Sequence, residues 1–311
     1  MHAKLNYLYL LLIFVGCLAS SCNSDSPEDV AGNGSELKFT VSDLTRAPVT
    51  TTLHQFAVYG DMKSVENNTA PFVVFDKTEV TYRNNTWSYS GMQYWFPYHE
   101  YSFVAVHPIS VLENGNNPLY ADSKLSFTYT LPTTGGNNIS SNDVSDILGA
   151  THRRNYGNGP TLPVSLTFSH LMSLINVAPA LNDNVMSADA YIEISKLELT
   201  GLKNKATFSI LPAPRLSNNQ TDDRVIEVTG QEGEANLTIE FATPKKIMNH
   251  GGNVRLLDSN DAIIMLPQEF TADSQSQIIL TYTISNETET KTMSSPLKQL
   301  SWESGKSYTY K

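Results

Sequence analysis

Polar and apolar residues alternate at period two in many short runs along this chain. The apolar positions of the clearest runs are Leu37, Phe39 and Val41; Tyr101, Phe103 and Ala105; Leu125, Phe127, Tyr129 and Leu131; Val164, Leu166 and Phe168; Leu237, Ile239 and Phe241; and Ile278, Leu280, Tyr282 and Ile284. Alternation puts the apolar side chains on one face of a strand and the polar ones on the other, which is typical of antiparallel sheets. Turn clusters rich in Asn, Gly and Pro separate the runs. The pattern predicts an all-β protein without amphipathic helices.

A break near residues 181–187 divides the chain after residue 35 into two halves. The halves, 36–181 and 182–311, each have the length of one ordinary β-sandwich. Short strands about every ten residues, separated by turns, favour sandwiches over a parallel sheet with crossover helices. We therefore expect two antiparallel β-sandwich domains in tandem.

Residues 1–22 have the organisation of a bacterial lipoprotein signal peptide. Lys4 precedes an uncharged apolar run from about Leu8 to Ala19, and small residues lead to Cys22. At about a dozen residues the run is too short to cross a bilayer, which takes roughly 20. We expect cleavage before Cys22 and acylation of its thiol, which places the mature protein on a lipid anchor outside the cytoplasm. Two alternatives stay open: an ordinary signal peptide, and modification of Cys17.

Residues 23–35 are polar and acidic, with too few apolar groups to pack, and are expected to form a flexible tether. Both cysteines lie in the leader, so we expect no disulfide and no cysteine metal site in the domains. The chain has 21 Lys and Arg against 31 Asp and Glu, a formal net charge of −10. This balance argues against nucleic acid and anionic lipid as partners.

Motifs that would indicate an enzyme are missing from the sequence. It contains no Gly-x-Ser-x-Gly elbow, no His-Glu-x-x-His pair and no phosphate-binding glycine-rich loop. The seven histidines are scattered singly, and no spacing singles out a pair of carboxylates for glycoside hydrolysis. We expect no enzymatic activity, no metal site and no cofactor.

The segment Tyr94–Tyr98 is an aromatic cluster with two interpretations. In the first, Tyr94, Trp95 and Tyr98 form an exposed platform for carbohydrate, because flat apolar rings pack well against sugar rings. In the second, Trp95 and Phe96 begin a strand and fill the core beneath it. We favour the second interpretation.

Seven short motifs follow one another along nearly the whole chain. They are the leader ending at Cys22, Leu44–Ala47, Tyr94–Pro97 with Phe103–Pro108, Asp146–Ala150, Leu166–Ser173, Leu266–Gln268 and Trp302–Tyr310. In this order and rough spacing they resemble the fimbrillin-like lipoproteins of Bacteroides-type pili. Each motif is weak by itself, and the resemblance depends on the whole series.

The resemblance implies two transthyretin-like β-sandwich domains, sorting to the outer membrane, and assembly with other pilus subunits into a fimbrium on the cell surface. Assembly would proceed by strand exchange, in which a strand from a neighbour repairs a sandwich that has lost one of its own. The removable strand would be Glu36–Asp43 within the segment 36–46, released by cleavage between Arg46 and Ala47. The alternative is that Arg46 is a solvated turn residue of an uncut lipoprotein.

The given sequence stops at Lys311, directly after the run Ser307–Tyr310 that looks like a last strand. A shaft subunit would carry a further alternating segment to donate, so we expect a tip or capping role. Alternatively, residues 295–310 rearrange to become the donor, with Trp302, Tyr308 and Tyr310 as anchors. A different function also stays open, that of an uncut, monomeric surface lipoprotein that binds host or bacterial glycans or proteins.

Overall fold

The computed structural model describes residues 35–42, 53–66, 70–113, 115–156, 162–181, 189–211, 226–248, 252–257 and 262–311. The expected signal peptide with Cys22, nearly all of the tether, and Arg46 and Ala47 lie outside these residues. The regular elements described are strands, apart from two short 3-10 helices, η1 (Ile109–Leu112) and η2 (Ser141–Asp143). None of the described helices is long and apolar enough to cross a membrane. The prediction of an all-β fold is confirmed.

One six-stranded antiparallel sheet has the order β12-β10-β5-β2-β3-β4. Its strands are β2 (Gln55–Ser64), β3 (Phe72–Arg83), β4 (Thr86–Tyr89), β5 (His99–His107), β10 (Leu148–Tyr156) and β12 (Ser169–His170). The hairpin between β3 and β4 turns at Asn84 and Asn85, whose φ angles are 51° and 61°. Asn tolerates this left-handed conformation, and two such residues in a row suit the tight turn that joins twisted strands.

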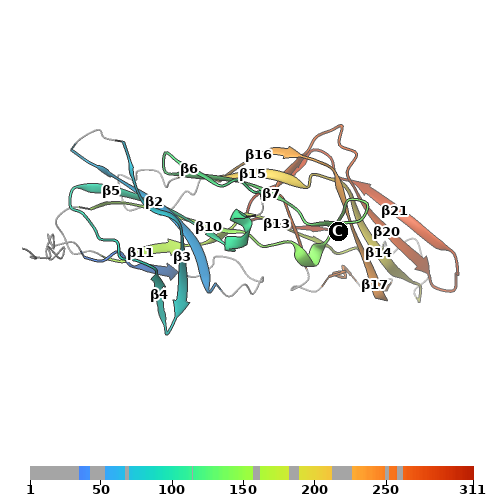
Figure 1. Cartoon of the computed structure of the whole chain (residues 1–311). Coiled ribbons are helices and arrows are strands. Elements are labelled where there is room, and N and C mark those ends of the chain that lie inside the picture. Colours follow the sequence, from blue (N-terminus) through green and yellow to red (C-terminus); the bar gives the residue numbers. More distant parts are fainter. Residues whose placement is uncertain are drawn as a thin grey trace, which may run out of the picture. The chain divides into compact units, whose positions relative to one another are not determined.

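Three of the other sheets contain strands from both halves of the chain (Figure 1). A second six-stranded sheet, β21-β20-β14-β17-β9-β8, consists of β8 (Thr133–Thr134), β9 (Asn138–Ile139), β14 (Tyr191–Leu202), β17 (Ala235–Met248), β20 (Gln277–Ile284) and β21 (Thr290–Pro296). A four-stranded sheet, β16-β15-β7-β6, consists of β6 (Leu119–Ala121), β7 (Lys124–Thr130), β15 (Lys205–Ile210) and β16 (Ile226–Glu232). A three-stranded sheet, β18-β13-β23, consists of β13 (Ser173–Val177), β18 (Ile263–Met265) and β23 (Ser307–Tyr310). Two pairs complete the fold: β1 (Phe39–Ser42) with β11 (Val164–Thr167), and β19 (Gln268–Phe270) with β22 (Leu300–Trp302).

Several strand pairs join residues on either side of the expected boundary between residues 181 and 182. β7 pairs with β15 from Leu125↔Ile210 to Thr130↔Lys205. β13, which precedes the boundary, pairs with β18 and β23, which follow it. The division into two tandem sandwich domains at this point stays a prediction.

Two hydrophobic cores share the strands β2 and β5. The first, which we call the aromatic core, consists of Leu37, Phe39, Phe56, Val58, Phe75, Val80, Trp95, Tyr101, Phe103, Ala105, Leu148, Ala150, Tyr156, Val164, Leu166 and Phe168. The second, the main core, draws its buried side chains from residues between Ala57 and Trp302. Along β5, Phe103 and Ala105 belong to the aromatic core, whereas Val104 and Val106 belong to the main core. The alternation expected for β5 is therefore incomplete, because both of its faces are buried.

Buried tyrosines make the stability of this fold sensitive to alkaline pH. Burial raises the pKa of Tyr59 to about 12, and Asp76 acts in the same direction. Burial also raises the pKa values of Tyr89, Tyr101 and Tyr310 above the ordinary value of 10.0. A raised pKa means that the unfolded chain loses these protons first as the pH rises.

We expect the free energy of unfolding to be insensitive to these groups below about pH 10, the pKa of tyrosine in an unfolded chain, and to fall above it. Urea denaturation at pH 8, 9, 10 and 11 measures this dependence. The variant Tyr59→Phe is expected to lose less stability between pH 10 and pH 11 than the unmodified protein. An equal loss in both proteins would show that Tyr59 does not contribute.

Candidate functional site

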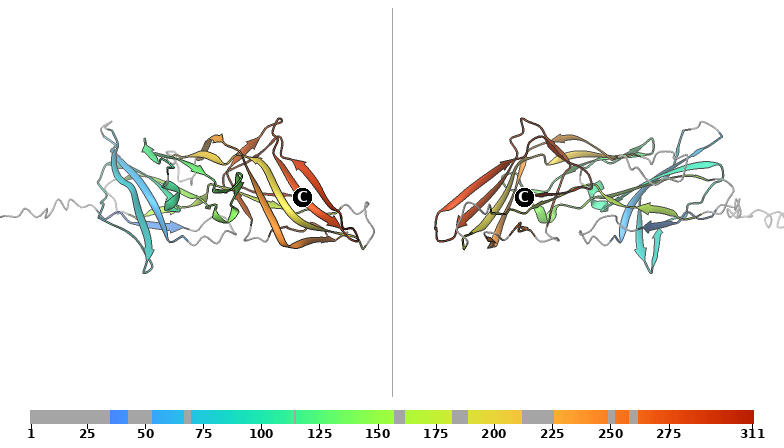
Figure 2. Two further views of the ribbon diagram at one scale, coloured as in Figure 1. Left: turned by 45° about the vertical axis from the view of Figure 1, so that its right-hand side comes forward. Right: turned by 180° about the vertical axis from the view of Figure 1, so that it is seen from behind.

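The strand β1 lies beside β11 and pairs with it in parallel, from Phe39↔Val164 to Ser42↔Thr167 (Figure 2). Within the described residues these two strands form a sheet of their own. The register is extended by the backbone N–H of Val164, which donates to the carbonyl oxygen of Lys38 at 2.7 Å. β1 is therefore hydrogen-bonded along its length to a single strand.

On the opposite side, the described residues contact this segment just before β1 begins. The backbone N–H of Leu37 donates to the carbonyl oxygen of Gln93 at 2.7 Å, and Glu36 forms an isolated antiparallel bridge with Tyr94. The hydroxyl of Tyr89 donates to the carbonyl oxygen of Leu37 at 2.8 Å. From Phe39 onward, no strand in the described part of the chain pairs with this side of β1.

The side chains of this segment alternate as predicted. Leu37 and Phe39 are 0% and 4% exposed, whereas Lys38 and Thr40 point to solvent. The next inward side chain, Val41, is partly buried and packs against the aromatic core. Burial of a large apolar side chain stabilises a fold by about 1.5–3 kcal/mol, so Leu37 and Phe39 contribute much of what holds β1 in place.

The ring of Phe39 lies among other aromatic rings of the aromatic core. Its centroid is 5.5 Å from that of Phe75, 5.8 Å from that of Tyr89 and 5.9 Å from that of Phe103, all in edge-to-face arrangements. Loss of β1 would therefore leave an apolar cavity beside the unpaired N–H and C=O groups of β11. A strand from another chain, with the same alternation of apolar and polar residues, would fill this cavity and pair with these backbone groups.

The structure separates the members of the aromatic cluster Tyr94–Tyr98. Trp95 is 1% exposed and packs edge-on against Tyr101, with ring centroids 4.7 Å apart. The guanidinium carbon of Arg154 lies 5.5 Å from the centroid of Trp95. The side chain of Trp95 thus fills the core, as the second interpretation has it, and its ring faces are not open to a ligand.

The neighbours of Trp95 point outward. Tyr94, Phe96 and Tyr98 are 41%, 47% and 48% exposed. Phe96 was expected in the core together with Trp95 and is not there. The exposed aromatic surface of this segment therefore consists of Tyr94, Phe96 and Tyr98.

Sequence reasoning missed a buried pair of titratable side chains. A carboxylate oxygen of Asp146 lies 2.6 Å from Nδ1 of His170, and the two side chains are 6% and 5% exposed. The pair joins the start of β10 to β12, where Leu148 pairs with His170. The two residues belong to different motifs of the series described above. Their place in these motifs was the one sequence feature that could have pointed to them. Among the described residues, no three His, Cys, Asp or Glu side chains come together to hold a metal ion.

A family model described as Fimbrillin-like matches residues 45–311. The chain belongs to the Fimbrillin-like family. The resemblance seen in the sequence is confirmed, and the match begins just after β1, which lies outside it. Comparison with proteins of curated function gives no match to this fimbrillin-like chain.

A solved structure of a fimbrial protein shares the fold of the fimbrillin-like chain. A fimbrial protein from Bacteroides vulgatus is 16% identical, with a TM-score of 0.53, and the match covers 88% of this chain and 93% of that chain. A candidate cell adhesion protein from Bacteroides uniformis is 17% identical, with a TM-score of 0.42, and the match covers 90% of this chain and 92% of that chain.

Proposed function

We propose that this fimbrillin-like protein is a fimbrial subunit that serves cell adhesion and joins other subunits by strand exchange at the position of β1. The observation that carries the proposal is the position of the segment from Leu37 to Ser42. It buries Leu37 and Phe39, and within the described residues its strand β1 pairs with β11 and with no other strand. Membership in the Fimbrillin-like family supports a place in a fimbrium and a structural rather than an enzymatic role.

Exchange requires that β1 be released, and we place the cut between Arg46 and Ala47. The bond follows the last residue of β1, Ser42, by four residues, so cleavage there separates the strand from the rest of the fold. An acylated Cys22 would hold the precursor at the outer membrane until the cut is made.

The contacts of β23 support a subunit that accepts a strand rather than one that donates its own C-terminal segment. β23 pairs with β13, and Nε1 of Trp302 donates to the hydroxyl of Tyr310 at 2.8 Å. Trp302 is also 2% exposed. Donation of residues 295–310 would disrupt these contacts, so we favour the tip or capping position in the fibre.

Replacement of Arg46 tests the proposal. We expect protein recovered from its own bacterial surface to begin at Ala47, and Arg46→Ala to abolish this N-terminus and to reduce incorporation into fibres at least tenfold. N-terminal sequencing and intact mass measure the cut, and the fibre fraction measures assembly. Arg83→Ala, at the end of β3, is the matched control and should be processed normally.

An N-terminus at acylated Cys22 in all of these proteins would contradict processing. That result would favour the second candidate function, an uncut surface lipoprotein that binds glycans. The exposed rings of Tyr94 and Tyr98 are the observation in favour of this alternative.

A further inference from the structure

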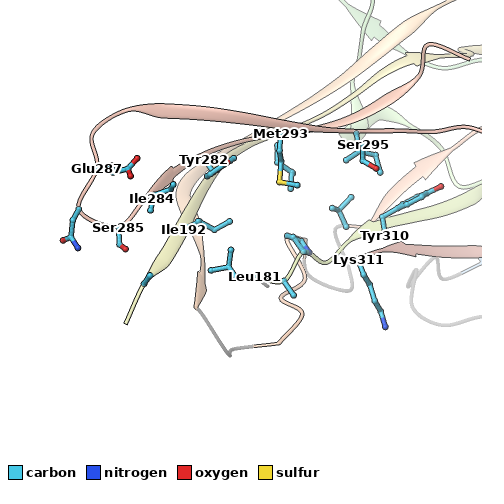
Figure 3. A pocket seen from close by; sticks show the side chains of 17 residues that line it. Leu181, Ile192, Tyr282, Ile284, Ser285, Glu287, Met293, Ser295, Tyr310 and Lys311 are labelled. Carbon is cyan, nitrogen blue, oxygen red and sulfur yellow. The ribbon is translucent and has the colours of Figure 1, made fainter. Parts of the chain in front are cut away.

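A cavity of about 390 Å³ opens beside β7, where residues of η1, η2 and β15 also line it. Polar side chains prevail in its lining, which includes Ser110, Asn116, Thr128, Tyr129, Thr130 and Ser145. We call it the polar cavity. A larger groove elsewhere in the fold, of about 720 Å³, has mainly apolar side chains such as Ile192, Tyr282 and Ile284 in its lining (Figure 3). The polar cavity therefore suits a ligand of different chemistry, one with many hydrogen-bonding groups.

Hydrogen bonds fasten the walls of the polar cavity to β7. The backbone N–H of Thr128 donates to the carbonyl oxygen of Asn116 at 2.8 Å, and Nδ2 of Asn116 donates to the carbonyl oxygen of Val111 at 2.8 Å. In the segment after η2, the backbone N–H of Ser145 donates to the hydroxyl of Tyr129 at 3.1 Å. These contacts hold the walls in place without a ligand, so binding would cost little ordering of the chain.

The charged side chains of the lining favour an uncharged ligand. Lys205 forms an ion pair with Glu232, so its charge is already compensated. Asp143 is an exposed carboxylate that accepts a hydrogen bond from the hydroxyl of Ser140. A phosphate or another anion would be repelled by Asp143 and would find no uncompensated cation among the described lining residues. The same carboxylate is a strong acceptor for the hydroxyl groups of a neutral molecule.

We propose that the polar cavity binds one neutral sugar residue of a glycan. Sugar hydroxyls both donate and accept hydrogen bonds, and the Ser, Thr and Tyr hydroxyls of the lining can do the same. Val111 and Pro132 add apolar surface, against which the C–H groups of a sugar ring can pack. The volume of about 390 Å³ is at the lower end of the range for small-molecule sites, roughly 300–1,000 Å³, which suits a single sugar rather than a chain of them.

The polar cavity is separate from the features on which the proposed function rests. None of its described lining residues belongs to the aromatic core or to the segment Tyr94–Tyr98. Strand exchange at β1 and the exposed aromatic surface therefore do not involve it. All of these lining residues follow Ala47, so cut and uncut protein both contain them. A fimbrial subunit with this cavity would recognise a sugar on the surface to which it adheres.

Saturation-transfer difference NMR tests the binding of sugars to the whole protein. The protein is recovered from its own bacterial surface in lauryldimethylamine oxide, a detergent without a sugar headgroup. The probes are the methyl glycosides of glucose, galactose, mannose, fucose and N-acetylglucosamine, and inorganic phosphate is the charged comparison. We expect at least one glycoside to bind saturably, and we expect phosphate not to compete with it.

Two variants of the lining locate the sugar. Asp143→Ala removes the carboxylate and should weaken binding at least tenfold, whereas Asp273→Ala, which removes an exposed carboxylate from a turn outside the cavity, should bind normally. Ser110→Trp adds a large ring at an exposed position of the lining and should abolish binding. Its control is Ser88→Trp, at an exposed position on β4. Circular dichroism checks that each variant keeps its fold.

Each other outcome overturns the inference. If no glycoside binds saturably, or if phosphate alone binds, the polar cavity does not recognise a neutral sugar. Binding that persists unchanged in Asp143→Ala or in Ser110→Trp would show that the sugar lies elsewhere. Its loss in the double variant Tyr94→Ala/Tyr98→Ala would then assign it to the exposed aromatic surface. The Arg46→Ala experiment measures processing and assembly, so failure of strand exchange and failure of sugar binding are distinguishable.

Discussion

Phe39→Ala is expected to lower the free energy of unfolding by about 3–5 kcal/mol, the usual cost of removing a buried phenylalanine ring. Phe39 is 4% exposed and its ring lies against Phe75, Tyr89 and Phe103, so the truncation leaves a cavity inside the aromatic core. Urea denaturation of the uncut protein, followed by tryptophan fluorescence, measures the change. Trp95 belongs to the same core and is a suitable reporter.

Thr40→Ala provides the control for Phe39→Ala, because Thr40 lies on the same strand with its side chain exposed. Its effect should stay within about 0.5 kcal/mol. If Phe39→Ala also cost less than about 1 kcal/mol, far below the range for a buried ring, the aromatic core would not depend on β1. Strand exchange at that position would then lack a driving force.

Asp146→Ala should also be destabilising, by about 1–3 kcal/mol, because it leaves a buried ring nitrogen without its hydrogen-bond partner. His170 is 5% exposed, and without the carboxylate its Nδ1 loses the partner that it has at 2.6 Å. Asp146→Asn preserves a polar partner without the charge and should cost less. Urea denaturation at pH 7 measures all of these variants.

The matched control is Asp143→Ala in the preceding turn. Asp143 is exposed and accepts a hydrogen bond from the hydroxyl of Ser140. Loss of a surface contact of this kind should cost less than about 1 kcal/mol. Equal effects at positions 143 and 146 would show that the buried pair has no special role.

Alternation was a sound guide wherever only one face of a strand is buried. Leu125, Phe127 and Tyr129 are all inward on β7, as the pattern predicts. The prediction was incomplete for β5, where the uninterrupted apolar run from Phe103 to Val106 is itself the signal for burial on both faces. The partner of β7 could not be read from the pattern, because its residues pair with β15 about 80 positions later, and packing rather than local sequence decides such pairings.

The aromatic cluster shows the same limit at the level of single residues. Adjacent positions of an extended segment point to opposite sides, so Trp95 and Phe96 cannot both enter one core. Trp95 is buried and Phe96 is exposed. The sequence offered no means to choose between the two rings.

Several motifs that carried the family resemblance meet in space. Gly149 of one motif pairs with Ser169 of another, next to the pair of Asp146 and His170. Gly305, from the last motif, has φ +71°, and a Cβ atom there would lie 3.0 Å from the carbonyl oxygen of His170. Glycine adopts this positive φ without strain and has no Cβ atom to approach the carbonyl oxygen. Motifs that are weak indicators singly therefore contact one another in the folded protein. The order of the residues along the chain does not reveal these contacts.

The strands β2 and β5 contribute buried side chains to both cores, and this sharing determines how the protein unfolds. Phe103 and Val104 are neighbours in the chain, yet they stabilise different cores. When β5 becomes disordered, both cores lose buried side chains at once. The unfolding of the two cores is therefore coupled into one cooperative transition. Heating or mechanical force should therefore unfold the two cores together rather than one after the other.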